Sequence, residues 1–378
     1  MTAALRAVTR RWRIVTLPGW FELTAIPRRL GTIGSTPVEV EFMKTAAYLP
    51  SLDEITEAGK LVYQVVEPTP AISWPLVNER LGASVWVKHE NHTPIGAFKA
   101  RTAMVYAAEL FRSRPGVKGL ITATRGNHGQ AVALAGQRFH VPVTIVVPHQ
   151  NSREKNAAMR AQGARLIEFG KDYQEAREHA QKLADQLQLD MVPPFHRDIV
   201  KGVATYWMEL FTRLPDLEVV FVPIGIGSGI SAGCAVRNGM RLKTRIVGVV
   251  SDRAPAYALS FEAGRRIEAP AMTAIADGVA CRAPDEEALA IILQNVDHIV
   301  RVSDEEVREA MKLLFVSTHN VAEGAGALSL AAALKEAESL RGKRVGLILT
   351  GGNVDREVFA RVLSEEDSCL QKELARPG

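Results

Sequence analysis

Cysteine is scarce in this chain of 378 residues. Only Cys234, Cys281 and Cys369 occur, an odd number placed far apart in the sequence. This pattern excludes a disulfide-rich scaffold, and it lacks the C-x-x-C spacing of a structural metal site. We therefore expect free thiols and a reducing, cytoplasmic compartment.

Long apolar runs and an excess of one charge are also missing. No run reaches the roughly 20 residues that a membrane-spanning helix needs, and the formal net charge is only +4. Residues 1–42 supply most of that charge, with six arginines against three glutamates. The rest of the chain thus predicts no broad basic surface for a nucleic acid or a membrane. A hydrophobic content of 47% with 23% charged residues is typical of a globular enzyme.

Residues 1–42 stand apart because they contain arginine but no lysine and show no sustained apolar period. Three interpretations stay open: an organelle-targeting peptide, a disordered extension, or a stretch upstream of a true start at Met43. We favour the second or the third, since Met43 opens directly onto a well-patterned sequence. Residues 366–378 are expected to form a tail.

Beyond about residue 84, short β-branched runs alternate with amphipathic stretches. Apolar runs predict strands at 84–88, 119–123, 143–147, 165–169, 219–223, 245–250 and 345–349. Helical periods predict helices at 99–111, 129–139, 153–162, 174–188, 202–212, 304–316 and 325–336. Such alternation predicts an α/β fold of mainly parallel, twisted sheets covered by helices.

The length of the chain allows two domains, each with its own core. We expect a small domain over residues 85–180 and a larger ligand-binding domain over residues 43–84 plus 181–365. A ligand is then expected in the cleft between them, at the carboxyl ends of strands.

Four loops that follow predicted strands carry the chemistry, and the first of them contains Lys99. It lies in Ile95-Gly-Ala-Phe-Lys-Ala-Arg101, at the start of a predicted helix. A helix N-terminus disfavours an ammonium ion, so a lysine there can have a lowered pKa and act as an amine nucleophile. A solvated surface lysine is the ordinary alternative.

The second loop is Thr122-Ala-Thr-Arg-Gly-Asn-His-Gly-Gln130. A strand, a glycine-containing turn and a helix start together form an anion site made of backbone N–H groups. Asn127 adds an amide that can bind a phenolate oxygen, and Thr124 adds a hydroxyl. An N-capped helix start without function is an equally good interpretation of this loop alone.

The third loop, Pro223-Ile-Gly-Ile-Gly-Ser-Gly229, has the glycine spacing of a phosphate-binding nest. The fourth, Leu349-Thr-Gly-Gly-Asn353, places the hydroxyl of Thr350 at the end of a strand. An amine, an amide for a phenolate, a phosphate nest and a neutral hydroxyl for a ring nitrogen together suit pyridoxal 5′-phosphate.

With these four loops the chain resembles the fold-type II pyridoxal-phosphate enzymes, whose fold is that of the tryptophan synthase β chain. Within that group it is similar to the serine/threonine dehydratases (ammonia-lyases) from about Ile55 to Val362. The segments Ala274–Val279 and Val321–Ala327 are also typical of the family.

The resemblance implies a role for each matching residue. Lys99 would form the Schiff base, Phe98 would flank the cofactor and Asn127 would bind its ring hydroxyl oxygen. Thr350 would meet the pyridine nitrogen. The phosphate would be held by Gly225, Ile226, Gly227, Ser228 and Gly229. The substrate carboxylate would be bound near Thr124, Gly126 and His128.

Four positions depart from the family pattern. Ile226 and Ser228 replace two glycines of the usual phosphate loop, but the backbone N–H groups survive both changes. Arg125 stands where serine racemases carry the serine that acts as the second base. A guanidinium is always protonated, so it makes a poor base, which disfavours racemisation. It would instead bind an acidic substrate group or point to solvent. Val250 stands where some relatives bind a divalent cation, so no metal site is expected.

The function implied is α,β-elimination from a small-molecule substrate, a 3-hydroxy amino acid such as threonine or serine, to a 2-oxo acid and ammonia. This activity would make the chain a carbon–nitrogen lyase, and the family also implies a homodimer. The alternatives are β-replacement as in cysteine synthases, a threonine synthase-like reaction, serine racemase-like activity, a non-catalytic binding protein and a nicotinamide-dependent dehydrogenase.

Overall fold

The computed structural model describes residues 48–365. The expected extension 1–42, the expected tail 366–378 and Cys369 lie outside these residues. None of the helices within 48–365 is both long and apolar enough to cross a bilayer.

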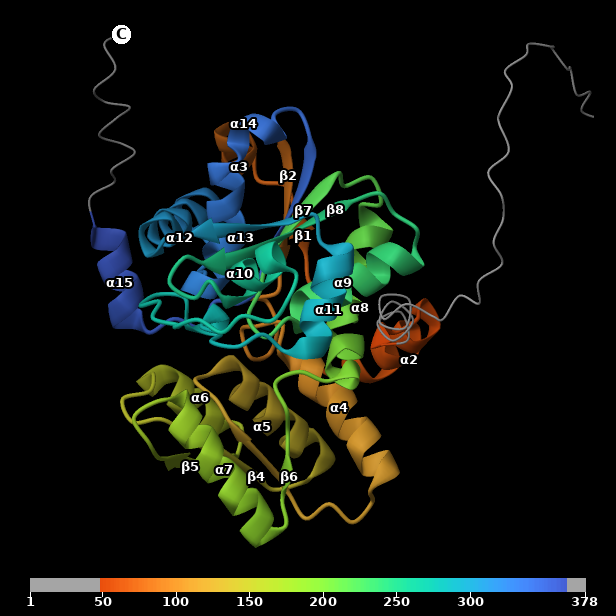
Figure 1. Cartoon of the computed structure of the whole chain (residues 1–378), viewed down its shortest axis with the longest axis vertical. Coiled ribbons are helices and arrows are strands. Elements are labelled where there is room, and N and C mark those ends of the chain that lie inside the picture. The colour runs from red at the N-terminus through yellow and green to blue at the C-terminus, as the bar shows by residue number, and fades with distance from the viewer. Residues whose placement is uncertain (1–47, 366–378) are drawn as a thin grey trace, which may run out of the picture. The chain divides into compact units, whose positions relative to one another are not determined.

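A six-stranded sheet forms the larger layer, in the order β1-β2-β10-β7-β8-β9 (Figure 1). Only β1 runs antiparallel, on the edge beside β2, and the other neighbours are parallel. The strands are β1 (Ala71–Ile72), β2 (Ser84–His89), β7 (Val219–Pro223), β8 (Arg245–Ser251), β9 (His298–Val302) and β10 (Arg344–Leu349).

A second sheet of four parallel strands has the order β5-β4-β3-β6. Its strands are β3 (Leu120–Ala123), β4 (Val143–Val147), β5 (Arg165–Glu168) and β6 (Asp190–Met191). The sequence missed β1, β6 and β9. The first two have only two residues each, and in β9 His298 and Arg301 interrupt the apolar run.

Helices cover both faces of each sheet because the strands are apolar on both sides. In the larger sheet Val219 and Phe221 face one core while Val220 and Val222 face another. The helices are α2 (Leu52–Val62), α3 (Pro75–Leu81), α4 (Ala100–Ser113), α5 (Asn127–Phe139), α6 (Arg153–Ala161), α7 (Tyr173–Leu187), α8 (Arg197–Arg213), α9 (Ser228–Gly239), α10 (Ala256–Ala263), η1 (Asp277–Val279), α11 (Glu286–Asn295), α12 (Asp304–Thr318), α13 (Gly324–Lys335), α14 (Ala337–Leu340) and α15 (Arg356–Ser364).

The cores show which helix covers which face. Buried residues of α12 and α13 pack on one face of the larger sheet, and those of α8, α9 and α11 pack on the other (Figure 1). The smaller sheet has α4 and α5 on one face and α7 on the other.

The division of the strands between the two sheets does not follow the expected domain ranges. β2 belongs to the larger sheet although residues 85–180 were assigned to the small domain, and β6 adds to the smaller sheet from beyond residue 181. The boundary at 180/181 would also fall inside α7. A division into two domains stays a prediction.

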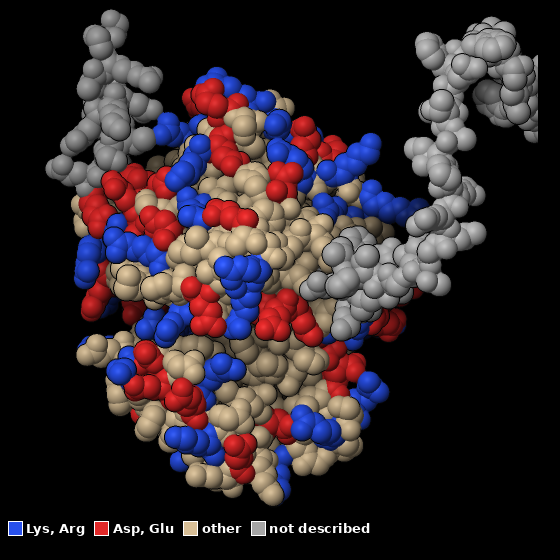
Figure 2. Space-filling model, in the orientation of Figure 1, with Lys and Arg blue, Asp and Glu red and all other residues tan. Residues whose placement is uncertain are grey.

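The charged side chains on the face shown in Figure 2 are mixed in sign. On the face shown in Figure 2, Lys and Arg side chains alternate with Asp and Glu over both the upper and the lower part of the molecule. This face offers no single-sign patch of the kind that attracts a polyanion.

Candidate active site

Lys99 lies at the junction between the β2 loop and α4, as the N-cap residue of that helix. The turn before it is tight. Gly96 has φ 67°, and a Cβ there would come within 2.7 Å of the Asn353 side chain. Thr93 closes the turn, since its hydroxyl accepts from the N–H of Ala97 (3.0 Å) and donates to the carbonyl of the same residue (2.7 Å).

Backbone hydrogen bonds join the Lys99 loop to the Thr350 loop. The N–H of Phe98 donates to the carbonyl of Thr350 (3.0 Å), and the N–H of Gly352 donates to the carbonyl of Gly96 (2.9 Å). Thr350 itself is buried directly after β10. Two loops that are about 250 residues apart in the chain therefore form one surface.

The amine of Lys99 also reaches the third loop. It lies 3.4 Å from the hydroxyl of Ser228 and 5.0 Å from the centre of the Phe98 ring. Burial lowers the pKa of this amine from 10.5 to about 8, because a low-dielectric surrounding disfavours the charged form. The expected lowering of its pKa is thus present, and desolvation is its cause.

The glycine-rich loop is shaped by what surrounds it. A Cβ on Gly225 would come within 2.5 Å of the Gly278 carbonyl, and Gly227 has φ 103°. The phenol of Tyr257 donates to the carbonyl of Ile226 (2.8 Å). The N–H of Ser231 donates to the Gly227 carbonyl (3.0 Å). The N–H groups before Ser231 have no acceptor inside α9, as is usual for the first residues of a helix.

The second loop begins α5 at Asn127. Its buried Thr124 hydroxyl accepts from the N–H groups of Gly126 (2.9 Å) and Gly129 (3.3 Å). The side chain of Thr124 therefore orders the turn, so a contact with substrate would come on top of that role. A Cβ on Gly126 would come within 2.4 Å of the Lys155 side chain.

Asn127 belongs to a polar network that sequence reasoning missed. Its amide donates to Glu323 and accepts from the amide of Asn353 (2.9 Å). Lys155 donates to the second oxygen of Glu323 (3.0 Å). Burial alone would lower the pKa of Lys155, but the carboxylate of Glu323 outweighs it and raises that pKa. Glu323 lies in the family-like segment 321–327, which was a usable signal; Lys155 had none.

His128 and Arg125 in this turn differ in their exposure to solvent: the ring nitrogens of His128 are buried, whereas the side chain of Arg125 is exposed. Burial lowers the pKa of His128 to about 3, with the charge of Lys99 acting in the same direction. Neither ring nitrogen of His128 meets hydrogen-bond geometry with any residue in 48–365. Arg125 is 43% exposed and forms an ion pair with Asp277 (2.7 Å).

Comparison with known proteins identifies this arrangement. Residues 62–351 match the family described as pyridoxal-phosphate dependent enzyme. The chain belongs to this family. It is 33% identical over 320 residues to the L-threo-3-hydroxyaspartate ammonia-lyase of Saccharomyces cerevisiae, covering 84% of this chain and 98% of that one. It is 30% identical to the serine racemase of Schizosaccharomyces pombe, covering 84% and 98%.

Among solved structures, the processed threonine deaminase isoform 2 of Solanum lycopersicum superimposes with a TM-score of 0.79 at 30% identity. The match covers 86% of this chain and 94% of that one. This pyridoxal-phosphate enzyme is therefore a fold-type II member of the serine/threonine dehydratase family. The family, the α/β fold class and the cofactor expected from the sequence are confirmed. The roles of individual residues stay predictions.

The residues of the site fit pyridoxal 5′-phosphate. The loop at 225–229 is a cradle in which a Cβ on Gly225 or Gly227 would clash with the protein. The half-buried Lys99 amine faces this loop through Ser228. Beside it stands His128: one of its buried ring nitrogens lies near the backbone of Val192, and the other has no protein partner among the described residues. A buried polar group without a partner is rare, and a bound ligand would satisfy it.

The pKa of Lys99 predicts how the apoprotein takes up its cofactor. Only the neutral amine attacks an aldehyde, so the rate of uptake should rise with pH and level off above about 8. Between pH 7 and pH 9 the neutral fraction increases about tenfold for such a pKa. Stopped-flow absorbance after mixing apoprotein with pyridoxal phosphate measures the rate. A rate that still climbs steadily through pH 9 would mean an unperturbed lysine.

Proposed function

We propose that this enzyme is an ammonia-lyase that converts a 3-hydroxy amino acid to a 2-oxo acid and ammonia. One observation carries the proposal: the amine of Lys99, with its lowered pKa, meets the glycine-rich loop at Ser228, and the backbone of the Lys99 loop is hydrogen-bonded to the Thr350 loop. A surface lysine would share neither contact. The ammonia-lyase and threonine deaminase named above support the reaction type.

The binding roles follow from the chemistry of the side chains. Lys99 would hold the cofactor covalently, and the N–H groups of residues 225–229 would bind its phosphate. Phe98 would flank the ring and Asn127 would face its hydroxyl oxygen. Thr350 would face the pyridine nitrogen. As a hydroxyl it carries no negative charge, so it does not favour a protonated ring nitrogen as a carboxylate would.

When bound, pyridoxal phosphate supplies an electron-withdrawing system that makes the Cα proton of an attached amino acid acidic. The amine of Lys99 takes that proton. A pKa of about 8 suits this task, because a base is most effective when its pKa lies near the working pH. His128 stays neutral near pH 7, given its pKa of about 3, so it can donate or accept a hydrogen bond without carrying a charge.

Racemisation is the second candidate, because a serine racemase is 30% identical. It needs a second proton carrier on the opposite face of the substrate. By the family resemblance Arg125 would stand at that position, and in the structure it is paired with Asp277. Since a guanidinium does not give up its proton, we favour elimination.

The reaction is tested with a panel of L-serine, L-threonine, L-threo-3-hydroxyaspartate and phenylserine. We expect equal amounts of ammonia and 2-oxo acid from at least one of them. Chiral chromatography follows the D-isomer, and a parallel series with sulfide follows β-replacement. The proposal is wrong if the D-isomer or a sulfide adduct accumulates faster than the 2-oxo acid, or if none of the four is consumed.

We also propose a cytoplasmic homodimer. Burial raises the pKa of the Cys234 and Cys281 thiols to about 12 and about 11, so both stay protonated and suit a reducing compartment. The dimer follows from the family resemblance. Sedimentation velocity of the full chain tests it, since a single monomeric species at micromolar concentration would contradict it.

A further inference from the structure

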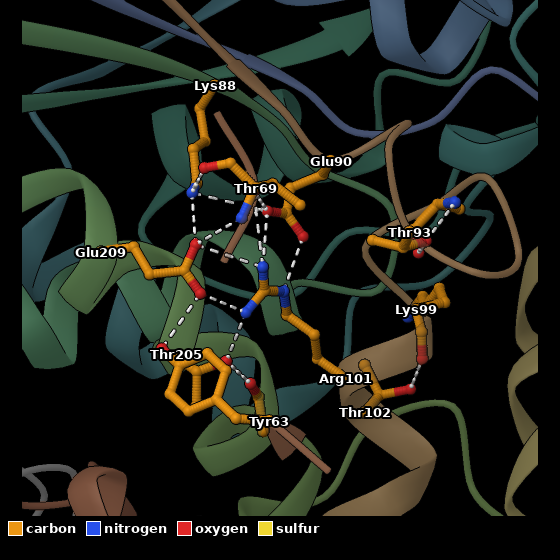
Figure 3. Close-up of polar contacts among 12 residues, drawn as sticks. Tyr63, Thr69, Lys88, Glu90, Thr93, Lys99, Arg101, Thr102, Thr205 and Glu209 are labelled. Carbon is orange, nitrogen blue, oxygen red and sulfur yellow. Dashed lines mark hydrogen bonds and ion pairs between the residues drawn. The ribbon is translucent and has the colours of Figure 1, made fainter. Parts of the chain in front are cut away.

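Four charged side chains lie inside the protein beside the Lys99 helix (Figure 3). They form what we name the buried ion cluster: Lys88, Glu90, Arg101 and Glu209. The side chains of Arg101 and Glu90 are 0% exposed, that of Lys88 is 1% and that of Glu209 is 11%. Two positive and two negative groups balance, so the cluster carries no net charge.

Arg101 is the centre of the cluster. Its Nε and Nη2 donate to the two oxygens of Glu90 (2.8 and 3.1 Å). Its Nη1 donates to Glu209 (2.6 Å) and to the hydroxyl of Thr205 (3.0 Å). Lys88 donates to Glu209 (2.5 Å) and to the carbonyl of Thr69 (2.8 Å). Nearly every polar atom of the guanidinium therefore has a fixed partner.

The cluster joins two separate elements, the end of β2 and α8, to the turn of α4 that holds Lys99. Glu90 follows β2, Glu209 and Thr205 lie on α8, and Arg101 lies in the first turn of α4. Thr102 ties the same turn together, since its hydroxyl donates to the carbonyl of Lys99 (2.7 Å). Arg101 is two residues from Lys99, so its guanidinium fixes the backbone that carries the amine.

Close packing adds to this restraint. A Cβ on Gly202 would come within 2.2 Å of the Arg101 carbonyl, so α8 touches the first turn of α4 with its backbone. The guanidinium of Arg101 lies 6.0 Å from the centre of the Tyr206 ring, whose edge meets the ring of Phe98 at 6.2 Å between centres. Phe98 directly precedes Lys99.

Such a cluster contributes less to stability than its number of contacts suggests. The desolvation of buried charges offsets most of their attraction, and well-packed apolar residues often serve a core as well or better. What buried ion pairs with this geometry provide is a unique arrangement, because a bidentate arginine tolerates little displacement.

We propose that Arg101 is a positioning residue for Lys99, holding its amine against the glycine-rich loop through Glu90 and Glu209. Within residues 48–365 the hydrogen bonds of its side chain go to Glu90, Glu209, Thr205 and Thr69, and none of these residues belongs to the loop at 225–229. The inference rests on the proposed role of Lys99. It predicts that loss of the guanidinium fork displaces the amine while the cofactor loops stay intact.

The experiment compares Arg101→Met, Arg101→Lys and a control, Arg197→Met, in the full-length protein, loaded with cofactor for dichroism and kinetics and as apoprotein for cofactor uptake. Arg197 lies on α8, the helix that also carries Glu209. It forms a two-point ion pair with Glu54 (2.6 and 2.7 Å), which is not part of the α4 turn. Each variant is measured well below its own melting temperature. The readouts are the circular dichroism of the bound cofactor, the pH midpoint of cofactor uptake, kcat and KM.

We expect Arg101→Met to change the dichroism band, to shift the uptake midpoint away from about pH 8 and to lower kcat at least about tenfold with little change in KM. A displacement of about 1 Å can cost about 10²-fold in rate. Arg101→Lys, which keeps the charge but loses the fork, should fall between. Arg197→Met should lower only the melting temperature.

The proposal is overturned if the Arg101 variants match Arg197→Met in dichroism, uptake midpoint and kcat. Should Arg101→Met fail to fold, the double variant Glu90→Gln/Arg101→Met removes one charge of each sign, and Arg101→Lys alone still decides the question. The first two readouts need no turnover. A wild-type protein that makes no 2-oxo acid would refute the proposed function. The dichroism and the uptake midpoint would still report on the role of Arg101.

Discussion

Lys99→Ala should abolish turnover and the visible absorption of the covalently held cofactor. The loss in kcat should be at least about 10³-fold, because general-base catalysis alone contributes about 10²- to 10⁴-fold and the covalent link is lost as well. Release of 2-oxo acid and the spectrum of the purified protein measure both effects. Borohydride reduction should fix the cofactor on the Lys99 peptide in the wild type and on no peptide in the variant.

The stability of the same variant gives an independent check. The pKa of Lys99 in the folded protein lies below its ordinary value of 10.5, so the unfolded chain binds more protons between about pH 8 and pH 10.5. The stability of the wild-type apoprotein should therefore rise with pH across this window. In Lys99→Ala that contribution to the rise should be absent. Lys99→Arg serves as the charged control, since it keeps a cation but supplies no amine nucleophile. A variant without Lys99 that still turned over substrate would refute the assignment.

Gly227→Ala should weaken cofactor binding at least about tenfold, because a left-handed conformation costs an alanine about 1–2 kcal/mol and the new methyl group has no room. Gly227 has φ 103°, and its added Cβ would lie 2.6 Å from the Cβ of Ala288 and 3.2 Å from the phenol oxygen of Tyr257. The start of α9 would have to move away from α11. Fluorescence titration of the apoprotein with pyridoxal phosphate measures the affinity.

Two other glycines provide matched controls. Gly264 has φ 64° and nothing within 4 Å of an added Cβ. The loss of folding stability in Gly264→Ala therefore measures the cost of a left-handed backbone conformation alone. At Gly229 the nearest protein atom to an added Cβ is 3.7 Å away, so alanine fits the protein there. Any loss of affinity in Gly229→Ala then measures the space that the phosphate needs. Equal affinities in wild type and Gly227→Ala would remove this loop from the cofactor site.

Local patterns accounted for the elements that lead into the site. The strands Val143–Val147 and Val219–Pro223 have the predicted bounds, because each is a short run rich in valine that a loop follows. The helix that starts at Asp304 was also located from its helical period, and in the structure Ser303 and Glu306 form a capping box at its start. Hydrophobic periodicity and capping act within a few residues of each other, so they can be identified in one sequence.

The partners of the site residues could not be identified in this way. The pair of Lys155 with Glu323 joins residues 168 apart in the chain, and that of Arg125 with Asp277 joins residues 152 apart. Which charges meet depends on the register of the strands and on the angles between helices. A sequence pattern carries neither when a single chain is considered alone.

By itself the sequence determined the order of the four loops, the amine at Lys99, the glycines of the cradle and hence the cofactor family. Each of these features depends on the type of residue at a given position, and the backbone alone cannot provide it. Only the tertiary structure decided the pKa of Lys99, the hydrogen bonds of Asn127 with Glu323 and Asn353, and the buried ion cluster around Arg101. These depend on how much water is excluded and on which distant groups are brought within a few ångströms, and folding fixes both.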